Sequence, residues 1–126
     1  MALSAYLRDK LLDHFLKGSA FAQPTNIYVS LHTGDPGTTG DHEVTGGSYE
    51  RQLANASFAA AASGVKSSNA IVDFAAMPAT TVTHVGIWDA LTTGNFLVGG
   101  ALAASKTTND GDTFRLPSGD IDVSLI

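Results

Sequence analysis

The chain contains no cysteine among its 126 residues. This absence excludes disulfide bonds, iron–sulfur clusters and zinc sites built on thiolates, and it frees the fold from any particular redox compartment. Because covalent cross-links are absent, the fold must be stabilised by packing within the chain or by assembly with other chains.

Charged residues are also scarce, at 15% of the chain, well below the roughly 25% of an ordinary soluble domain. Seven basic residues, scattered along the sequence, stand against twelve acidic ones, for a net charge of −5. No basic patch that would bind nucleic-acid phosphates is therefore expected. The polar residues are largely Thr, Ser, Gly and Asn, so we expect a neutral surface suited to packing against other subunits.

Long hydrophobic runs are missing as well. Near the N-terminus, Arg8, Asp9, Lys10 and Asp13 interrupt the apolar residues, which does not match a signal peptide, and no apolar stretch reaches membrane-spanning length. We therefore expect a protein that is made in the cytoplasm and used in water, without a membrane partner. With 44% hydrophobic residues the chain can bury one core, so residues 1–126 are expected to form a single domain.

One helix is expected, over residues 4–17. Its apolar residues recur at a spacing of four, at Leu7, Leu11 and Phe15. This spacing places them on one face of a helix, and two further leucines widen that face. Ser4 is a suitable N-cap, and Gly18 offers the left-handed residue that commonly ends a helix. We expect the apolar face to pack on the chain's own core; the alternative is a helix that docks on a neighbouring molecule.

From residue 26 to residue 126 the pattern favours strands, with alternating apolar and polar residues. Residues 27–32 predict a half-buried strand, and the C-terminal residues alternate in the same way. The segment 33–47 is rich in Gly, Thr and Asp, which predicts a long exposed loop. The predicted fold class is therefore mainly β, an antiparallel β-sandwich, jelly roll or small barrel with one N-terminal α-helix.

Turn residues predict two hairpins. The first joins strands at 81–89 and 96–102 through Thr-Thr-Gly-Asn. The second joins strands at 106–108 and 113–116 through a turn with Asp110 and Gly111, because Asp-Gly readily adopts positive φ angles.

No group of residues in the sequence indicates a specific chemistry. The four histidines lack the paired spacing of a zinc site, and Asp41, His42 and Glu43 are adjacent in a loop, where neighbouring side chains rarely reach one ion. The C-terminal aspartates do not follow the spacing of an EF-hand and are expected to form turns. No nucleophile elbow and no paired carboxylates stand out for hydrolysis. We therefore expect no catalytic residue, no cofactor and no metal.

Several short segments, in this order, resemble one known family. They are Leu3-Ser4-Ala5-Tyr6, Leu11-Leu12-Asp13-His14, Ile27-Tyr28-Val29-Ser30-Leu31-His32-Thr33 with Asp35-Pro36-Gly37, Gly47-Ser48-Tyr49-Glu50-Arg51-Gln52, Val82-Thr83-His84-Val85-Gly86-Ile87-Trp88-Asp89 and Gly111-Asp112-Thr113-Phe114-Arg115. From end to end the chain resembles the small tail-fibre-like virion structural proteins of tailed bacteriophages, and related folds also serve as capsid cement proteins. The resemblance implies a virion component without catalysis and brings no active-site residues.

Three roles follow from these observations. We expect a capsid decoration protein on the outer surface of the head, a homo-oligomer, most simply a trimer, that bridges major capsid subunits, because the sequence has no repeat that would build a fibre shaft. The alternative is a tail-fibre or receptor-binding module of the phage tail, in which the 33–47 loop contacts a host-surface receptor. A carbohydrate-binding domain, with Tyr28, Tyr49 and Trp88 lining a groove, is the third alternative.

The residues expected to contact a partner come from the helix, from the 33–47 loop and its neighbourhood, and from one strand. They are Leu7, Leu11, Phe15, Asp35, Pro36, His42, Tyr49, Arg51 and Trp88. For the large side chains among them, burial in the protein's own core is the alternative to contact with a partner.

Overall fold

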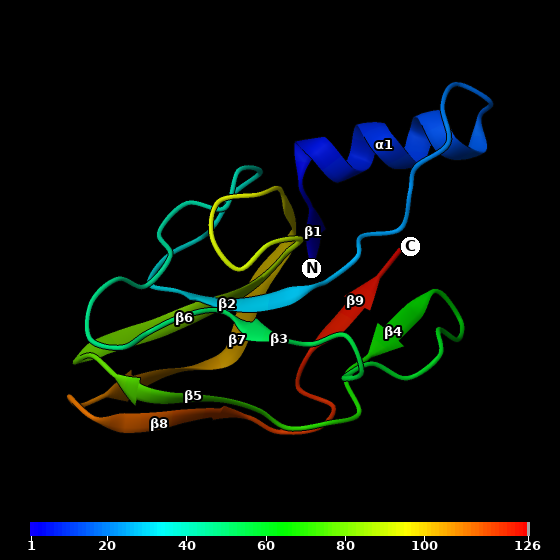
Figure 1. Ribbon diagram of the computed structural model, residues 1–126. Coiled ribbons are helices and arrows are strands. Elements are labelled where there is room, and N and C mark those ends of the chain that lie inside the picture. The colour runs from blue at the N-terminus through cyan, green and yellow to red at the C-terminus, as the bar shows by residue number, and fades with distance from the viewer. Residues whose placement is uncertain (126) are drawn as a thin grey trace.

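The computed structural model describes residues 1–125, in which it shows one helix and nine strands (Figure 1). Helix α1 spans Ala5–Phe15. The strands are β1 (Ala2–Leu3), β2 (Tyr28–His32), β3 (Gln52–Leu53), β4 (Val65–Ser67), β5 (Val72–Met77), β6 (Thr80–Trp88), β7 (Phe96–Thr108), β8 (Asp112–Leu116) and β9 (Asp122–Ser124). The prediction of a mainly β fold behind one N-terminal helix is confirmed, although Ile126, the last residue of the predicted β-rich region, lies outside the described residues.

The strands form one larger sheet and two pairs, and all pairings are antiparallel. The five-stranded sheet has the order β1-β7-β6-β2-β3, and the pairs are β4–β9 and β5–β8. In Figure 1 the β5–β8 pair lies beneath the five-stranded sheet, and the β4–β9 pair stands to its right. The sheets are layered as in a sandwich and do not close on themselves, so the small-barrel alternative is wrong.

The hydrophobic core fills the space between these layers. The five-stranded sheet contributes Val29, Leu31, Val82, Val85 and Ile87. The β5–β8 pair contributes Val72, Phe74, Met77, Phe114 and Leu116. The two phenylalanine rings meet edge to face with centroids 6.3 Å apart, a favourable geometry for aromatic pairs.

Strand β2 is buried on both faces, whereas the sequence predicts burial on one. Val29 and Leu31 face the core, and the polar side chains Ser30 and His32 on the opposite face are also inaccessible to solvent. The alternation of apolar and polar residues is present, but it separates two buried environments instead of core and solvent. A second layer of structure must therefore cover the outer face of β2.

The 33–47 loop supplies that cover, and the prediction that it is an exposed loop is wrong for part of its length. The loop folds back along β2, where Val44 N–H donates to Leu31 O at 2.9 Å and Thr33 N–H donates to His42 O at 2.9 Å. Pro36 and Val44 are buried, while the tip around Gly37 stays in solvent. Backbone pairing, which composition does not reveal, holds the segment down.

Helix α1 begins directly after the predicted N-cap, one residue later than the predicted range of 4–17, and ends two residues earlier. Ser4 caps it, with Oγ accepting from Leu7 N–H at 3.0 Å. Lys17, rather than Gly18, takes the left-handed conformation, with φ of 70°. Gly18 follows one position later and its N–H donates to Asp13 O at 2.7 Å, which satisfies a terminal carbonyl of the helix. In the described residues no helix combines the length and hydrophobicity needed to cross a membrane.

The first predicted hairpin is confirmed, and the second is not. Strands β6 and β7 pair along most of their length, with a large irregularity at 102–105, so the segments predicted at 96–102 and 106–108 form one strand. Gly111 has the positive φ expected of its turn, at 89°. That turn, however, leads from β7 to β8, and β8 pairs with β5 in the other layer. A turn sequence specifies a change of direction but not which strand becomes the partner.

Candidate functional site

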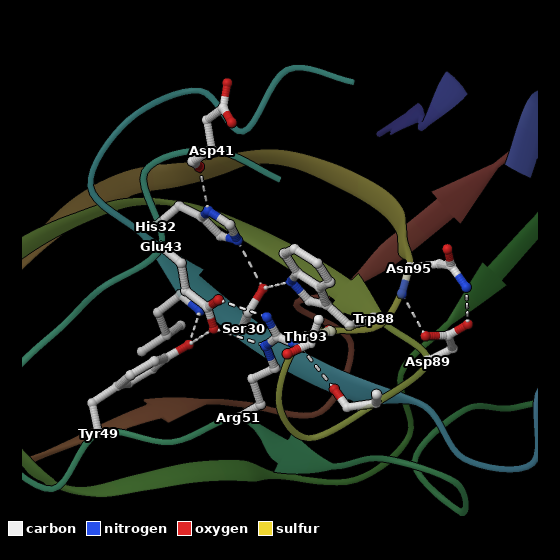
Figure 2. Close-up of polar contacts among 12 residues, drawn as sticks. Ser30, His32, Asp41, Glu43, Tyr49, Arg51, Trp88, Asp89, Thr93 and Asn95 are labelled. Atoms are coloured by element: carbon white, nitrogen blue, oxygen red, sulfur yellow. Dashed lines mark hydrogen bonds and ion pairs between the residues drawn. The ribbon is translucent and has the colours of Figure 1, made fainter. Parts of the chain in front are cut away.

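Two features of the described chain are candidates for a functional site. One is a buried cluster of polar side chains on the outer face of β2 (Figure 2). The other is the apolar face of α1, the helix at the top of Figure 1.

Arg51 is the centre of the polar cluster and is only 7% exposed. Its Nε and Nη2 donate to the two carboxylate oxygens of Glu43, both at 2.9 Å. Its Nη1 donates to the carbonyl oxygens of Ala90 and Thr93, both at 2.8 Å. The planar guanidinium thereby ties the 33–47 loop to the turn that joins β6 and β7, a task for which arginine's forked donors are suited.

Tyr49 extends the cluster toward the core. Its hydroxyl donates to Glu43 Oε2 at 2.8 Å and accepts from Leu31 N–H at 3.0 Å. Burial raises the pKa of the Tyr49 hydroxyl far above its ordinary value, and the nearby Glu43 carboxylate acts in the same direction. The hydroxyl therefore remains a neutral donor, and Glu43 has both of its oxygens engaged.

A second chain of hydrogen bonds runs from Trp88 to the loop backbone. Trp88 Nε1 donates to Ser30 Oγ at 3.0 Å, and Ser30 Oγ lies 2.7 Å from His32 Nε2. His32 Nδ1 lies 2.7 Å from the carbonyl oxygen of Asp41. Because a carbonyl can only accept, Nδ1 carries the proton in the neutral ring, and Ser30 donates to Nε2. Burial lowers the pKa of His32 below 6.5, which favours this neutral tautomer.

The side chains of this cluster bond to one another and to loop backbone, and they hold the loops in place. Ser30 and His32 stand at the distance of a nucleophile and its base, yet neither is accessible to solvent, so no substrate can approach them. Asp41, His42 and Glu43 do not converge, because Glu43 turns inward to Arg51, whereas Asp41 uses its backbone carbonyl. Residues 1–125 contain no group of three histidine or carboxylate side chains placed to hold a metal ion.

The apolar face of α1 is the second candidate. No residue of the helix is buried, and Leu12, Phe15 and Leu16 are 49%, 62% and 67% exposed. Tyr6 and Leu7 pack partly against the core, so only the first turns of the helix are held down. The expectation that the apolar face packs on the chain's own core is therefore wrong for most of that face, and the docking alternative fits the structure better.

Two hollows adjoin this face. One, of about 350 Å³, lies between α1 and the sheets and is lined almost wholly by apolar side chains such as Leu7, Ile87 and Val123. The other lies along the helix and is lined by Leu3, Arg8, Leu11, Leu12, Phe15 and Leu125. Leu125 lines both, so the exposed helix face and the hollows form one continuous apolar surface. We call this surface, with Leu12, Phe15 and Leu16 at its centre, the α1 face.

The structure separates the residues that the sequence offers as partner contacts into two groups. Tyr49, Arg51 and Trp88 come together in the cluster. Pro36 is buried as well. The remaining candidates are at least partly accessible: Leu7, Leu11, Phe15, Asp35 and His42. Of the three aromatic residues considered for a sugar-binding groove, Trp88 is buried, whereas Tyr28 and Tyr49 are half-buried. Contact of the nine residues with a partner remains a prediction.

Several important residues escape the sequence analysis. Ser30 and His32 read as the solvent side of a strand, and Glu43 as part of a loop. One available signal is that an acidic residue, Glu43, lies close in sequence to Arg51, but such opposite charges are common on surfaces. Leu12 and Leu16 widen the predicted stripe, and only the structure shows that they stay uncovered.

The comparison with known proteins decides the family. A family model described as Podophage GP4 fiber I protein gp80 matches residues 2–124, nearly the whole chain. The chain belongs to this family. No curated protein matches it.

Membership in this family of phage fibre proteins confirms the resemblance to small tail-fibre-like virion proteins. The chain is a bacteriophage structural protein located in the virion, where it associates with other virion proteins. Within the fold, the buried cluster ties together the loops on the outer face of the five-stranded sheet.

Proposed function

We propose that the protein is a non-enzymatic component of a tail fibre and that it joins its neighbours through the α1 face. The fibre family match is the observation that carries this proposal, since it favours the tail over the capsid decoration role. The α1 face supports it physically. Burying the exposed parts of Leu12, Phe15 and Leu16 would contribute on the order of 3 kcal/mol or more to assembly.

The absence of a fibre shaft from the sequence is compatible with this role if another virion protein supplies the shaft. In that arrangement the protein is a head-like module, assembled as a homo-oligomer, most simply a trimer. The exposed tip of the 33–47 loop then belongs to a loop that Arg51 holds in place through Glu43 and Ala90, which suits a surface that contacts a host receptor.

Location in the virion is tested by labelling the protein directly. A short epitope tag placed at Gly37, where a side chain would meet open space, should leave the fold intact. Gold-labelled antibody should then decorate the tail of tagged virions. Label distributed over the head in many copies would establish the decoration role instead.

A binding experiment provides an independent test. Purified protein is incubated with phage heads that lack it and with intact host cells, and bound copies are counted on each. We expect saturable binding to cells and none to heads. Stoichiometric binding to heads would overturn the tail proposal. Replacement of the exposed tip residues 37–39 by Gly and Ser should abolish binding to cells while the fold is retained.

A further inference from the structure

The two sides of α1 are treated differently by the protomer. The segment that follows the helix turns back along its more polar side, where Phe21 N–H donates to His14 Nδ1 at 3.0 Å and the Phe21 ring meets Tyr6 edge to face at 6.4 Å. The opposite side, with Leu12 and Leu16, has no such cover. The contacts of the following segment with the helix therefore lie on its more polar side, and the apolar side is left open.

Two oppositely charged residues, Arg8 and Asp9, lie next to the open apolar side of the helix. Arg8 lines the hollow beside Leu12 and Phe15, and Asp9 follows it on the helix. In residues 1–125 the ion pairs are Glu43–Arg51 and Asp73–Arg115, so within the described protomer neither Arg8 nor Asp9 has an ion-pair partner. A basic and an acidic group thus stand next to an uncovered apolar surface.

We propose that α1 of a second copy of this chain covers the α1 face, with the helices parallel about a cyclic symmetry axis and Arg8 of each copy paired with Asp9 of the next. The inference deepens the proposed function, because it names the first partner of the α1 face. Charge complementarity selects this occupant: the face carries both the cation and the anion that an identical neighbour would require.

Charge also selects the parallel direction. In parallel helices Arg8 stands at the level of Asp9 of its neighbour, one residue or about 1.5 Å along the axis. An antiparallel pair centred on Leu12 would instead place Arg8 against Leu16, a charge against an apolar side chain. An antiparallel pair centred on Arg8 and Asp9 would leave Phe15 and Leu16 uncovered beyond the partner's N-terminus.

The interface extends beyond the helix. An 11-residue helix offers less than the roughly 800 Å² per partner of a stable interface. Leu3 and Leu125 line the hollow beside α1 and belong to β1 and the C-terminal segment, so a neighbour seated on α1 also reaches the body of the protomer. A cyclic arrangement repeats this contact and leaves no copy with an uncovered face.

Charge reversal tests the pairing. Arg8→Asp sets two carboxylates against each other across the interface, and Asp9→Arg sets two guanidinium groups against each other. The double variant restores an opposite pair. By sedimentation velocity over a range of concentrations, we expect each single variant to associate about tenfold or more weakly than the wild type, and the double variant to recover most of the loss.

Two controls accompany the charge-reversal variants. Lys10→Asp reverses a charge on the side of the helix that carries Tyr6, away from the α1 face, and should leave association unchanged. Circular dichroism and the fluorescence of the single tryptophan verify that every variant is folded. A wild-type chain that stays monomeric at high concentration, single variants that associate normally, or a double variant without recovery would each overturn the proposed pairing.

Disulfide cross-linking tests the direction of the helices. Because the sequence contains no cysteine, only the introduced thiols can react. Ala5→Cys and Leu16→Cys, made separately, should each form disulfide-linked dimers under mild oxidation if the helices are parallel. Dimers that form only when the two variants are mixed would show antiparallel helices. Ile71→Cys, at a residue 53% exposed on the body, is the matched control and should not cross-link efficiently.

These outcomes are independent of the labelling of virions. A chain that is monomeric in solution but labels the tail would overturn this inference and leave the proposed function standing. A parallel oligomer that labels the head would overturn the proposed function and leave this inference standing.

Discussion

The guanidinium of Arg51 lies over the indole of Trp88, with its central carbon 3.7 Å from the ring centroid. The same group makes the bidentate pair with Glu43 and holds two carbonyl oxygens of the β6–β7 turn. One side chain therefore joins an aromatic strand residue, a loop and a turn. We expect this contact to determine whether the loops on the outer face of the sheet keep their positions.

Arg51→Ala should lower the free energy of unfolding by about 3–5 kcal/mol, because it leaves the Glu43 carboxylate and two carbonyl groups without their donor. Arg51→Lys should restore little of this loss, since an ammonium group cannot make the bidentate pair. Urea unfolding measures both. Arg115→Ala, which removes the solvent-exposed pair with Asp73, is the control and should change stability little. An equal loss for both arginines would contradict the assigned role of Arg51.

Gly40 and Gly37 distinguish packing from backbone strain within one loop. Both have positive φ, but a Cβ at Gly40 would collide with the Trp88 ring, whereas one at Gly37 meets open space. Gly37→Ala should cost about 1 kcal/mol for the left-handed backbone alone. Gly40→Ala should cost about 2–4 kcal/mol and shift the fluorescence of Trp88. An unchanged emission spectrum for Gly40→Ala would show that the loop does not pack on the indole.

Acidification should weaken the fold through His32. Burial holds the pKa of His32 in the folded protein below its unfolded value near 6.5, so the unfolded state binds more protons in this range. The contribution of the neutral His32 to the free energy of unfolding is complete above pH 6.5, and it is lost as the pH falls toward the pKa of His32 in the folded protein. Free energies of unfolding measured at pH 7.5, 6.5 and 5.5 give the slope of stability against pH. His32→Gln retains the other three histidines, so a slope as steep as that of the wild type would contradict this assignment.

Two phenylalanines provide a test of where the core ends. Phe74 is 1% exposed between the layers, and Phe15 is 62% exposed on α1. Phe74→Ala should destabilise the protomer by about 3–5 kcal/mol, whereas Phe15→Ala should stay within about 0.5 kcal/mol when the protein is kept dilute. Thermal unfolding at low concentration compares them. A large loss for Phe15→Ala in the dilute monomer would place the helix within the core.

Local patterns in the sequence determined the elements and their turns. The spacing of Leu7 and Leu11 predicted the helix, Ser4 its cap, and alternation the strands near residues 27–32, because these signals act between residues a few positions apart. The order of short segments along the chain was also enough to indicate the phage family, which the family match confirms.

Only the tertiary structure decided which surfaces are covered. The 33–47 loop encloses Ser30 and His32 through backbone pairing and through Arg51, contacts between segments that no local pattern encodes. For the same reason the amphipathic pattern of α1 could not say whether its apolar side meets the protein's own core or a neighbour. Burial depends on what lies opposite a side chain in space, and the fold places nothing opposite Leu12, Phe15 and Leu16 within the described protomer.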